Sequence, residues 1–372
     1  MKHFCYVTGV YGRRDPLIVE RQGWSLQKAG FHVSYIVCDN LPSEQYNGID
    51  IISTGFAPKG RLERFINTKK YIYDAAIKQD ADFYQVSDPE LISLGRKLKR
   101  KGKKVIFNLR EYYPDLILKK FYMPRILRKV MSHYYNFCIE HYLNDYDAVF
   151  TITPEIVDLL KRRHNIKNVY LLTNYPIPNE DYILSKDDYL QRPNMLFYEG
   201  TIYSISRQEK VLDALSMLEG IKYLLVGRIE DSYENIKKHP YWKYVEFHDG
   251  FNKKELKVFF ERATICNTLR DFGVMDGSLG VIKLFESMEA ALPVLLSDVP
   301  LYRDLVSKYN CGLCVNPNNT EAIRKAIKYL IDNKEEAYQM GQNGRNAVLK
   351  EFNWHKQAEK YIRIICEMNN CD

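Results

Sequence analysis

A repeated alternation between short apolar runs and longer segments of helical periodicity is the feature that most constrains the fold. The runs are rich in β-branched and aromatic residues, as expected of parallel strands that helices cover on both faces. In the N-terminal half this alternation predicts strands at 4–10, 32–38, 50–53, 82–86, 105–109 and 148–151, and helices at 15–30, 62–79, 89–101, 124–144 and 154–164.

A second series of the same kind follows segment 174–193, which contains three prolines, shows little periodicity and reads as a linker. A chain of 372 residues is also long for one domain. The sequence therefore predicts an α/β protein of two doubly wound, Rossmann-like domains, at 1–175 and 176–353, with a C-terminal helix at 354–372 that packs back toward the first domain. The second series predicts strands at 195–198, 222–226, 244–247, 263–266, 294–296 and 312–315, and helices at 208–218, 253–261, 282–290, 300–307, 319–333, 335–349 and 354–369.

Residues 277–286 read as a glycine-bearing loop that leads into a helix and then a short apolar strand. A helix N-terminus exposes unpaired N–H groups and the positive end of the helix dipole, which suit a phosphate group. Lys283 adds a positive charge, and Glu286 lies on the same face, where it can accept hydrogen bonds from ribose hydroxyls. The segment indicates a nucleoside diphosphate site, although Lys283 and Glu286 could instead form a surface ion pair.

Composition excludes several classes of protein. Hydrophobic residues make up 46% of the chain and charged residues 27%, which is typical of a soluble globular protein. No apolar run approaches the ~18 residues of a membrane-spanning helix, and the N-terminal segment is too polar for a signal peptide, so we expect a cytoplasmic protein. The eight cysteines lie mostly in apolar contexts, and the single CxxC at Cys311 and Cys314 lacks a second pair at zinc spacing, so no metal or cofactor is expected.

The net charge of +7 is concentrated in the first 180 residues, which hold 28 Lys and Arg against 19 Asp and Glu. Such asymmetry indicates a polyanionic partner, either nucleic acid or an anionic membrane. The basic run 96–104 suits a helix C-terminus, and no nucleic-acid-binding motif accompanies it, so we do not expect the protein to bind nucleic acid. Residues 116–138 interleave five cations with apolar side chains and contain no acid. They predict contact with an anionic membrane surface, with an ordinary core helix as the alternative.

Several motifs in both halves resemble one enzyme family. Residues 283–294 resemble the signature K-L-F-E-x-M-A-A-G-x-P-V of retaining GT-B glycosyltransferases of the family-4 type, especially those of capsule and surface polysaccharide pathways. Residues 310–317, 340–345 and 352–354 resemble the strand and the closing helices that follow it in that family. The resemblance covers nearly the whole chain and implies a GT-B fold, in which two Rossmann-like domains face each other across a cleft. It also implies that the first domain binds the acceptor and the second the nucleotide sugar.

The resemblance also assigns roles to residues of the second domain. Arg207 and Lys283 would contact the donor diphosphate, and Glu286 would bind the ribose. Segment 244–251, which includes Gly250, would offer backbone groups to the base. Two cations and a helix N-terminus can stabilise a departing nucleoside diphosphate without a metal ion. The implied donor-binding set is Gly200, Thr201, Arg207, Gly250, Ser278, Leu279, Gly280, Lys283 and Glu286, with Arg207, Lys283, Glu286, Arg110 and Glu111 as the catalytic set.

On the acceptor side the resemblance points to Gly12, Asp15 and Asp88. Gly12 and Asp15 follow the first strand, where the family has a loop that closes on its substrates; Asp15 could otherwise cap the next helix. Asp88 lies in a match to H-D-P-E-L, with Ser in place of His. Arg110 and Glu111 begin a match to H-E-x-Y-P, with Arg in place of His. The alternative to a functional role for these two residues is an ion pair at the end of a strand.

One departure from the family lies in the donor loop. Many relatives have a glutamate near the sugar, eight residues before the ribose carboxylate, and here that residue is Ser278. Asp276 or Asp271 could replace it, or could belong to a surface loop. The family's sugar specificity therefore does not transfer to this chain.

The resemblance implies a glycosyltransferase that moves a sugar, with retention, from a nucleotide sugar to a lipid-linked glycan in surface polysaccharide biosynthesis. The donor is expected to be UDP-linked, and the enzyme is expected at the inner face of the cell membrane. Two alternatives remain: a GT-B-fold epimerase that acts on a UDP-sugar, and a non-catalytic GT-B module in a membrane biosynthetic complex.

Overall fold

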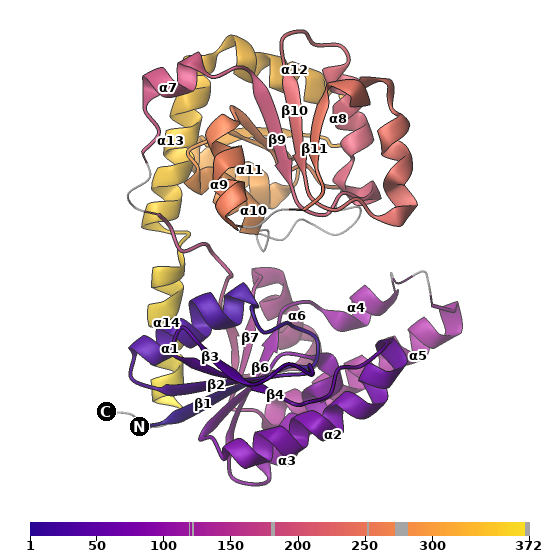
Figure 1. Ribbon diagram of the computed structural model, residues 1–372, viewed down its shortest axis with the longest axis vertical. Helices are drawn as coiled ribbons and strands as arrows, with labels where there is room; N and C mark the ends of the chain where they lie inside the picture. Colours follow the sequence, from indigo (N-terminus) through magenta and orange to yellow (C-terminus); the bar gives the residue numbers. More distant parts are fainter. Residues whose placement is uncertain (119, 121–122, 180–182, 251–252, 272–281, 369–372) are drawn as a thin grey trace. The chain divides into compact units, whose positions relative to one another are not determined.

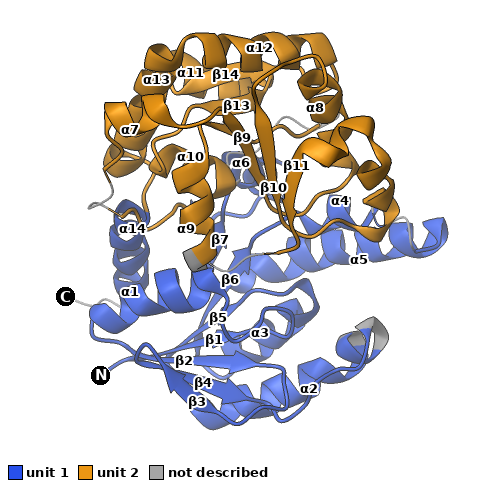
Figure 2. Ribbon diagram, turned by 45° about the horizontal axis from the view of Figure 1, so that its top comes forward, with its two compact units in different colours: residues 1–174, 354–372 blue, residues 175–353 orange. Residues whose placement is uncertain are grey.

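The computed structural model describes residues 1–372 except 119, 121–122, 180–182, 251–252, 272–281 and 369–372. The chain divides into two compact units, residues 1–174 with 354–372 (unit 1) and residues 175–353 (unit 2) (Figure 2). Each unit is built on one sheet with helices packed against it (Figure 1).

Unit 1 holds an eight-stranded sheet in the order β3-β4-β2-β1-β5-β6-β7-β8. Every pairing is parallel except that between β3 and β4 at the edge. The strands are β1 His3–Val7, β2 His32–Val37, β3 Glu44–Tyr46, β4 Ile49–Ser53, β5 Phe83–Val86, β6 Lys104–Leu109, β7 Ala148–Thr151 and β8 Val169–Leu171. Its helices are α1 Gly23–Lys28, α2 Arg61–Gln79, α3 Ile92–Lys99, α4 Tyr113–Leu118, α5 Arg125–Tyr142, α6 Pro154–His164 and α14 Trp354–Glu367.

Strand β1 shows how helices cover both faces of this sheet. Successive side chains of a strand point to opposite faces. Cys5 and Val7 belong to the core that α2 and α3 complete. Phe4 and Tyr6 face the other way, toward Tyr361 of α14, and the Tyr6 and Tyr361 hydroxyls lie 2.9 Å apart. The C-terminal helix is thus part of unit 1.

Unit 2 holds a six-stranded, wholly parallel sheet in the order β11-β10-β9-β12-β13-β14. The strands are β9 Met195–Glu199, β10 Lys222–Val226, β11 Val245–His248, β12 Ile265–Asn267, β13 Val294–Ser297 and β14 Gly312–Val315. The helices are α7 Lys186–Gln191, α8 Gln208–Leu215, α9 Lys253–Arg262, α10 Ile282–Glu289, α11 Pro300–Tyr309, α12 Thr320–Asp332 and α13 Lys334–Lys350.

The structure corrects several element boundaries. The first strand ends at Val7 rather than Val10, and one π-helical turn at Leu17–Gln22 precedes α1 within the predicted helix 15–30. The predicted linker 174–193 contains α7, which begins where the Ser185 hydroxyl accepts the Asp188 N–H at 3.1 Å. The short strands β3 and β8 and helix α4 were not predicted, because three to six residues carry too little periodicity to detect.

Candidate functional site

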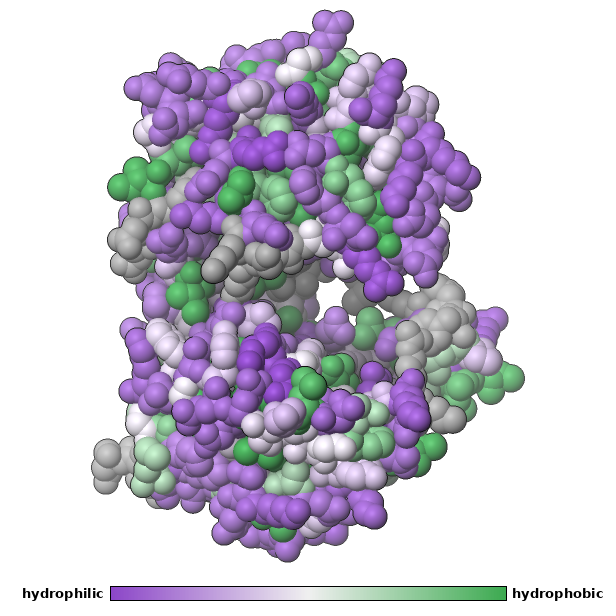
Figure 3. Space-filling view, viewed as in Figure 1, coloured by the Kyte–Doolittle hydropathy of each residue, from purple (hydrophilic) through white to green (hydrophobic). Residues whose placement is uncertain are grey.

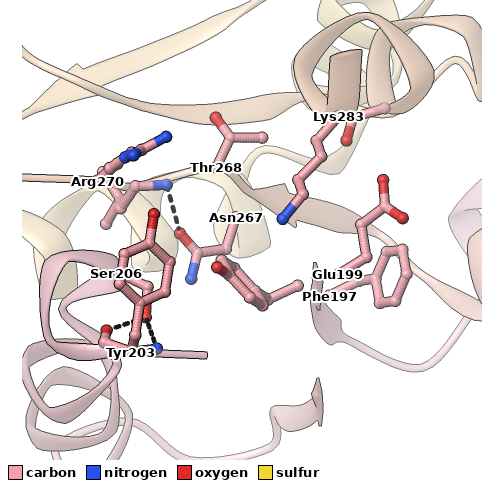
Figure 4. A pocket seen from close by; sticks show the side chains of 11 residues that line it. Phe197, Glu199, Tyr203, Ser206, Asn267, Thr268, Arg270 and Lys283 are labelled. Carbon is pink, nitrogen blue, oxygen red and sulfur yellow. Dashed lines mark hydrogen bonds between the residues drawn. The ribbon is translucent and has the colours of Figure 1, made fainter. Parts of the chain in front are cut away.

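The chain reverses its direction of sheet growth beside β9. From β9 it runs outward through β10 to β11, then returns to place β12 on the other side of β9. Ligands of open parallel sheets bind beyond the carboxyl ends of the strands at such a switch point. A cavity of about 70 Å³ lies there in unit 2 (Figure 4). Its lining comes from β9, β12, α10 and the segments after both strands: Phe197, Tyr198, Glu199, Tyr203, Ser206, Asn267, Thr268, Leu269, Arg270, Lys283 and Ser287.

Lys283 supplies a cation to this cavity from the first turn of α10. Its ammonium group reaches down into the cavity from the helix (Figure 4) and lies 5.5 Å from the centre of the Tyr198 ring. The end of the side chain occupies the space that a Cβ on Gly200 would need, and Gly200 has a φ of +113°. The positive φ favours glycine at position 200, and a larger residue there would also displace the end of the Lys283 side chain. Burial, and after it the nearby Arg270, lower the pKa of Lys283, while Glu199 and Glu286 oppose that change.

Two carboxyl groups face Lys283. Glu199 ends β9 and is 6% exposed, and Glu286 lies one turn after Lys283 on α10. The two carboxyl groups are within hydrogen-bonding reach of each other. Burial and the proximity of Glu286 raise the pKa of Glu199 well above its ordinary range. Lys283 and Glu199 thus line the cavity, whereas Glu286 interacts with both of them but is not among the lining residues.

Arg270 brings a second cation to the cavity lining, with its guanidinium 5.8 Å from the centre of the Tyr203 ring. Arg207, which the sequence assigned to a diphosphate, is not among the residues that line this cavity. Its guanidinium binds the Asp271 carboxylate, with Nε 3.1 Å from Oδ2, and lies 3.6 Å from Glu209. Asp271, a candidate substitute for the carboxylate missing at 278, is thus an ion-pair partner of Arg207.

The rest of the predicted donor set is dispersed. Thr201 follows Gly200, and its carbonyl accepts the Tyr198 hydroxyl at 2.9 Å. Gly250 follows β11 with a φ of +86°. Ser278, Leu279, Gly280 and Asp276 lie outside the described residues.

Unit 1 gathers its candidate residues at the carboxyl ends of β1, β5 and β6. Asp88 is 1% exposed; its carboxylate accepts the Thr8 hydroxyl at 3.0 Å and the Gly9 N–H. Burial raises the pKa of Asp88 to about 7, although these donors oppose the change. Gly12 lies on the adjacent loop, where its carbonyl accepts the Tyr35 hydroxyl at 3.0 Å.

Arg110 forms a two-pronged ion pair with Asp15, both contacts at 2.9 Å, and its guanidinium lies 3.7 Å from the centre of the Tyr11 ring. Asp15 also accepts the Ile18 N–H at 3.1 Å and so caps the following turn. Arg110 thus pairs with Asp15, whereas the exposed neighbour Glu111 does not line any described cavity.

The basic segment 116–138 spans the end of α4 and most of α5. Helix α5 packs on the core through Ser132, Tyr135, Cys138 and Ile139. Its opposite side exposes an apolar stripe, here called the α5 stripe, formed by Ile126, Val130, Tyr134 and Phe137. Hydrophobic atoms gather at the right of Figure 3, where Figure 1 draws the start of α5. The predicted amphipathic helix is therefore apolar on two sides, and one of them is exposed.

Residues 186–347 match the family model described as "Glycosyl transferases group 1". Unit 2 carries a glycosyltransferase group 1 domain. The match confirms the prediction of an enzyme of the glycosyltransferase class. No curated protein matches the chain in a sequence search.

Solved structures with the same fold span both units around this glycosyltransferase domain. Sucrose-phosphate synthase from Thermosynechococcus elongatus is 16% identical, with a TM-score of 0.77 and 100% of each chain covered. The Anabaena protein HepE in complex with UDP-glucose is 10% identical, with a TM-score of 0.71 and 99% of this chain and 100% of that chain covered. WaaG, a glycosyltransferase involved in lipopolysaccharide biosynthesis, is 13% identical, with a TM-score of 0.69 and coverage of 98% and 99%. These likenesses confirm the predicted GT-B fold.

Sequence reasoning missed two residues of the glycosyltransferase domain, Glu199 and Arg270. Glu199 had a detectable signal, because it is a carboxylate at the end of an otherwise apolar strand and immediately precedes a glycine. Arg270 is the third residue after β12 and belongs to no motif, so only the fold brings it to the cavity. No group of three potential metal ligands occurs among the described residues, and none of the helices in the described ranges is long and apolar enough to cross a membrane.

Proposed function

We propose that the protein transfers a sugar from a UDP-linked donor to a lipid-linked glycan, with retention of the anomeric configuration. The observation that carries the proposal is the position of Lys283. Its ammonium group lies at the switch point of a parallel sheet, against the glycine that follows β9 and one turn before Glu286. This arrangement suits a nucleoside diphosphate, with phosphate oxygens on Lys283 and ribose hydroxyls on Glu286.

The same geometry supports the chemistry of transfer. Breaking the bond between the sugar and the diphosphate leaves negative charge on the departing phosphate and oxocarbenium character on the sugar. Lys283 supplies a cation that is already in place, and Arg270 lines the same cavity. The pairing of Arg207 with Asp271 favours a role for Arg207 in shaping the loop after β9, with Arg270 as the second phosphate contact.

We further propose that unit 1 binds the acceptor beside Asp88 and Arg110 and that the α5 stripe lies on an anionic membrane at the cytoplasmic face. The stripe recurs at intervals of three and four residues, which places its members on one side of the helix. Exposed Arg125 and Lys129 lie near its start. Apolar side chains flanked by cations suit the boundary between lipid headgroups and acyl chains. A lipid-linked acceptor would reach the enzyme at that boundary.

Calorimetry with UDP tests the donor site. Lys283→Ala and Glu286→Ala should each weaken binding by about tenfold, the loss expected for one charge-assisted contact. Lys325→Ala, which removes an exposed lysine of α12, is the matched control and should leave the affinity unchanged. Wild-type affinity in both site variants would refute the assignment. Turnover of a UDP-sugar without acceptor would favour the epimerase alternative.

A further inference from the structure

Glu199 has no task in the function proposed above, yet it is the acid among the residues that line the described cavity. It is 6% exposed, and its Oε1 atom is buried without a hydrogen-bond partner among the described residues. An ionised carboxylate that is removed from water without donors is strongly disfavoured. The position of Glu199 at the end of β9 therefore favours the neutral acid.

The groups around Glu199 come from three elements. Tyr198 precedes it on β9, Cys266 lies on β12, and α10 contributes Lys283 and Glu286. Within the described part of the chain, Lys283 is the group that favours an ionised Glu199, and it also interacts with Glu286. One lysine thus faces two carboxyl groups. Interacting acids of this kind share a proton, so that one is charged while the other is neutral.

Exposure decides which of the two acids keeps the proton. Glu286 is partly exposed on α10, whereas Glu199 is buried at the strand end. Water can stabilise the charge on Glu286 but not that on Glu199, so the proton belongs on Glu199. A neutral carboxyl has one O–H to donate, and the acceptor within its reach is the Glu286 carboxylate.

We propose that Glu199 is a positioning residue that stays protonated and donates a hydrogen bond to Glu286, which holds the Glu286 carboxylate in place for the ribose of a bound nucleoside diphosphate. The inference rests on the proposed function, which assigns Glu286 to the ribose. A neutral Glu199 also leaves the charge of Lys283 available for phosphate oxygens. No covalent bond is made or broken, and the proton stays on Glu199 while the nucleotide binds.

Calorimetry with UDP between pH 6 and pH 9, on the wild type, Glu199→Gln and Glu199→Leu, tests the inference. Gln keeps a neutral donor, whereas Leu has a similar size and no donor. At pH 6 we expect Glu199→Gln to match the wild type and Glu199→Leu to bind about tenfold more weakly, the loss of one hydrogen bond to a charged group. As pH rises and Glu199 loses its proton, wild-type affinity should fall further than that of Glu199→Gln. Glu199 interacts with Lys283, so the titration of Lys283 is matched between Glu199→Gln and Glu199→Leu, which both lack the carboxyl group, and the pH dependence of these two variants is compared as well.

A second pair of variants distinguishes positioning from simple support of the fold. In a Glu286→Ala background, Glu199→Leu should cost no further affinity, because the hydrogen-bond acceptor that Glu199 positions is gone. Equal and pH-independent losses for Glu199→Gln and Glu199→Leu would overturn the inference but leave the proposed function standing. A further tenfold loss of affinity for Glu199→Leu in the Glu286→Ala background would also overturn it. A folded wild type that binds no UDP would overturn both.

Discussion

Each unit places a buried carboxyl group at the carboxyl end of a central strand, but the two carboxyl groups have different surroundings. In unit 1 the Asp88 carboxylate accepts hydrogen bonds from Thr8 and Gly9, and the nearby Arg110 is neutralised by Asp15. In unit 2 Glu199 has a buried oxygen without a donor among the described residues, beside a lysine that faces two acids. The difference between the two carboxyl groups is thus that Asp88 has hydrogen-bond donors in its own unit, whereas one oxygen of Glu199 has none among the described residues.

The ion pair of unit 1 provides the most severe test of this comparison. Asp15→Ala removes the partner of Arg110, whose side chain is 13% exposed, and should lower the free energy of unfolding by about 3 kcal/mol, as for other broken buried pairs. Asp271→Ala removes the partner of Arg207, which is 32% exposed, and should cost under about 1 kcal/mol. Chemical denaturation measures both. Equal losses in the free energy of unfolding would show that the ion pairs of the two units contribute alike to stability.

Two glycine substitutions distinguish the loop after β9 from the loop after β1. Gly200→Ala forces a left-handed φ on alanine and displaces Lys283, so UDP affinity should fall by more than about tenfold, and stability by about 1–2 kcal/mol. Gly12→Ala adds a Cβ that meets no described atom within 4 Å at a position without positive φ. It should change neither quantity measurably. Calorimetry and thermal unfolding of the two variants decide the point, and wild-type binding by Gly200→Ala would contradict the description of the cavity.

Asp88 should make the free energy of unfolding depend on pH. With its pKa raised to about 7 in the folded state, the folded protein binds this proton more tightly than the unfolded chain does. The resulting stability is complete below the unfolded pKa of about 4 and is lost as pH rises through 7. The loss between pH 6 and pH 8 should be about 1.4 kcal/mol. Asp88→Asn should lack this loss when thermal unfolding is followed at both pH values, and parallel curves for the two proteins would refute the prediction.

The smallest expected effect on stability concerns the α5 stripe. Ile126 is 80% exposed, so Ile126→Ser should change the free energy of unfolding by less than about 0.5 kcal/mol. The same change should weaken binding to vesicles that contain anionic lipid, measured by co-sedimentation. Ser132→Ala on the core side of α5 is the control for vesicle binding. Unaltered sedimentation of Ile126→Ser would argue against membrane contact through the stripe.

The sequence predicted the parallel α/β character and most of the strands because buried strands of parallel sheets are continuous apolar runs. It also singled out Lys283 and Glu286 as donor-site candidates, since a helix start with a cation and a carboxylate one turn later is a local pattern, and Lys283 lines the cavity. Pairings between distant residues were not predictable in this way. Arg110 meets Asp15 across 95 residues and Arg207 meets Asp271 across 64, and such contacts depend on strand order rather than on local sequence.

The division of the chain also has a consequence for biosynthesis. Unit 1 contains both the first residues and the last, because Trp354 donates to the Ser25 hydroxyl and Tyr361 packs against Phe4. A ribosome therefore synthesises all of unit 2 before it makes α14, the helix that covers one face of the first strand. The face that carries Phe4 and Tyr6 therefore stays exposed until α14 has been made. Truncation before residue 354 should thus leave a nascent protein whose N-terminal sheet retains an uncovered aromatic face and depends on chaperones.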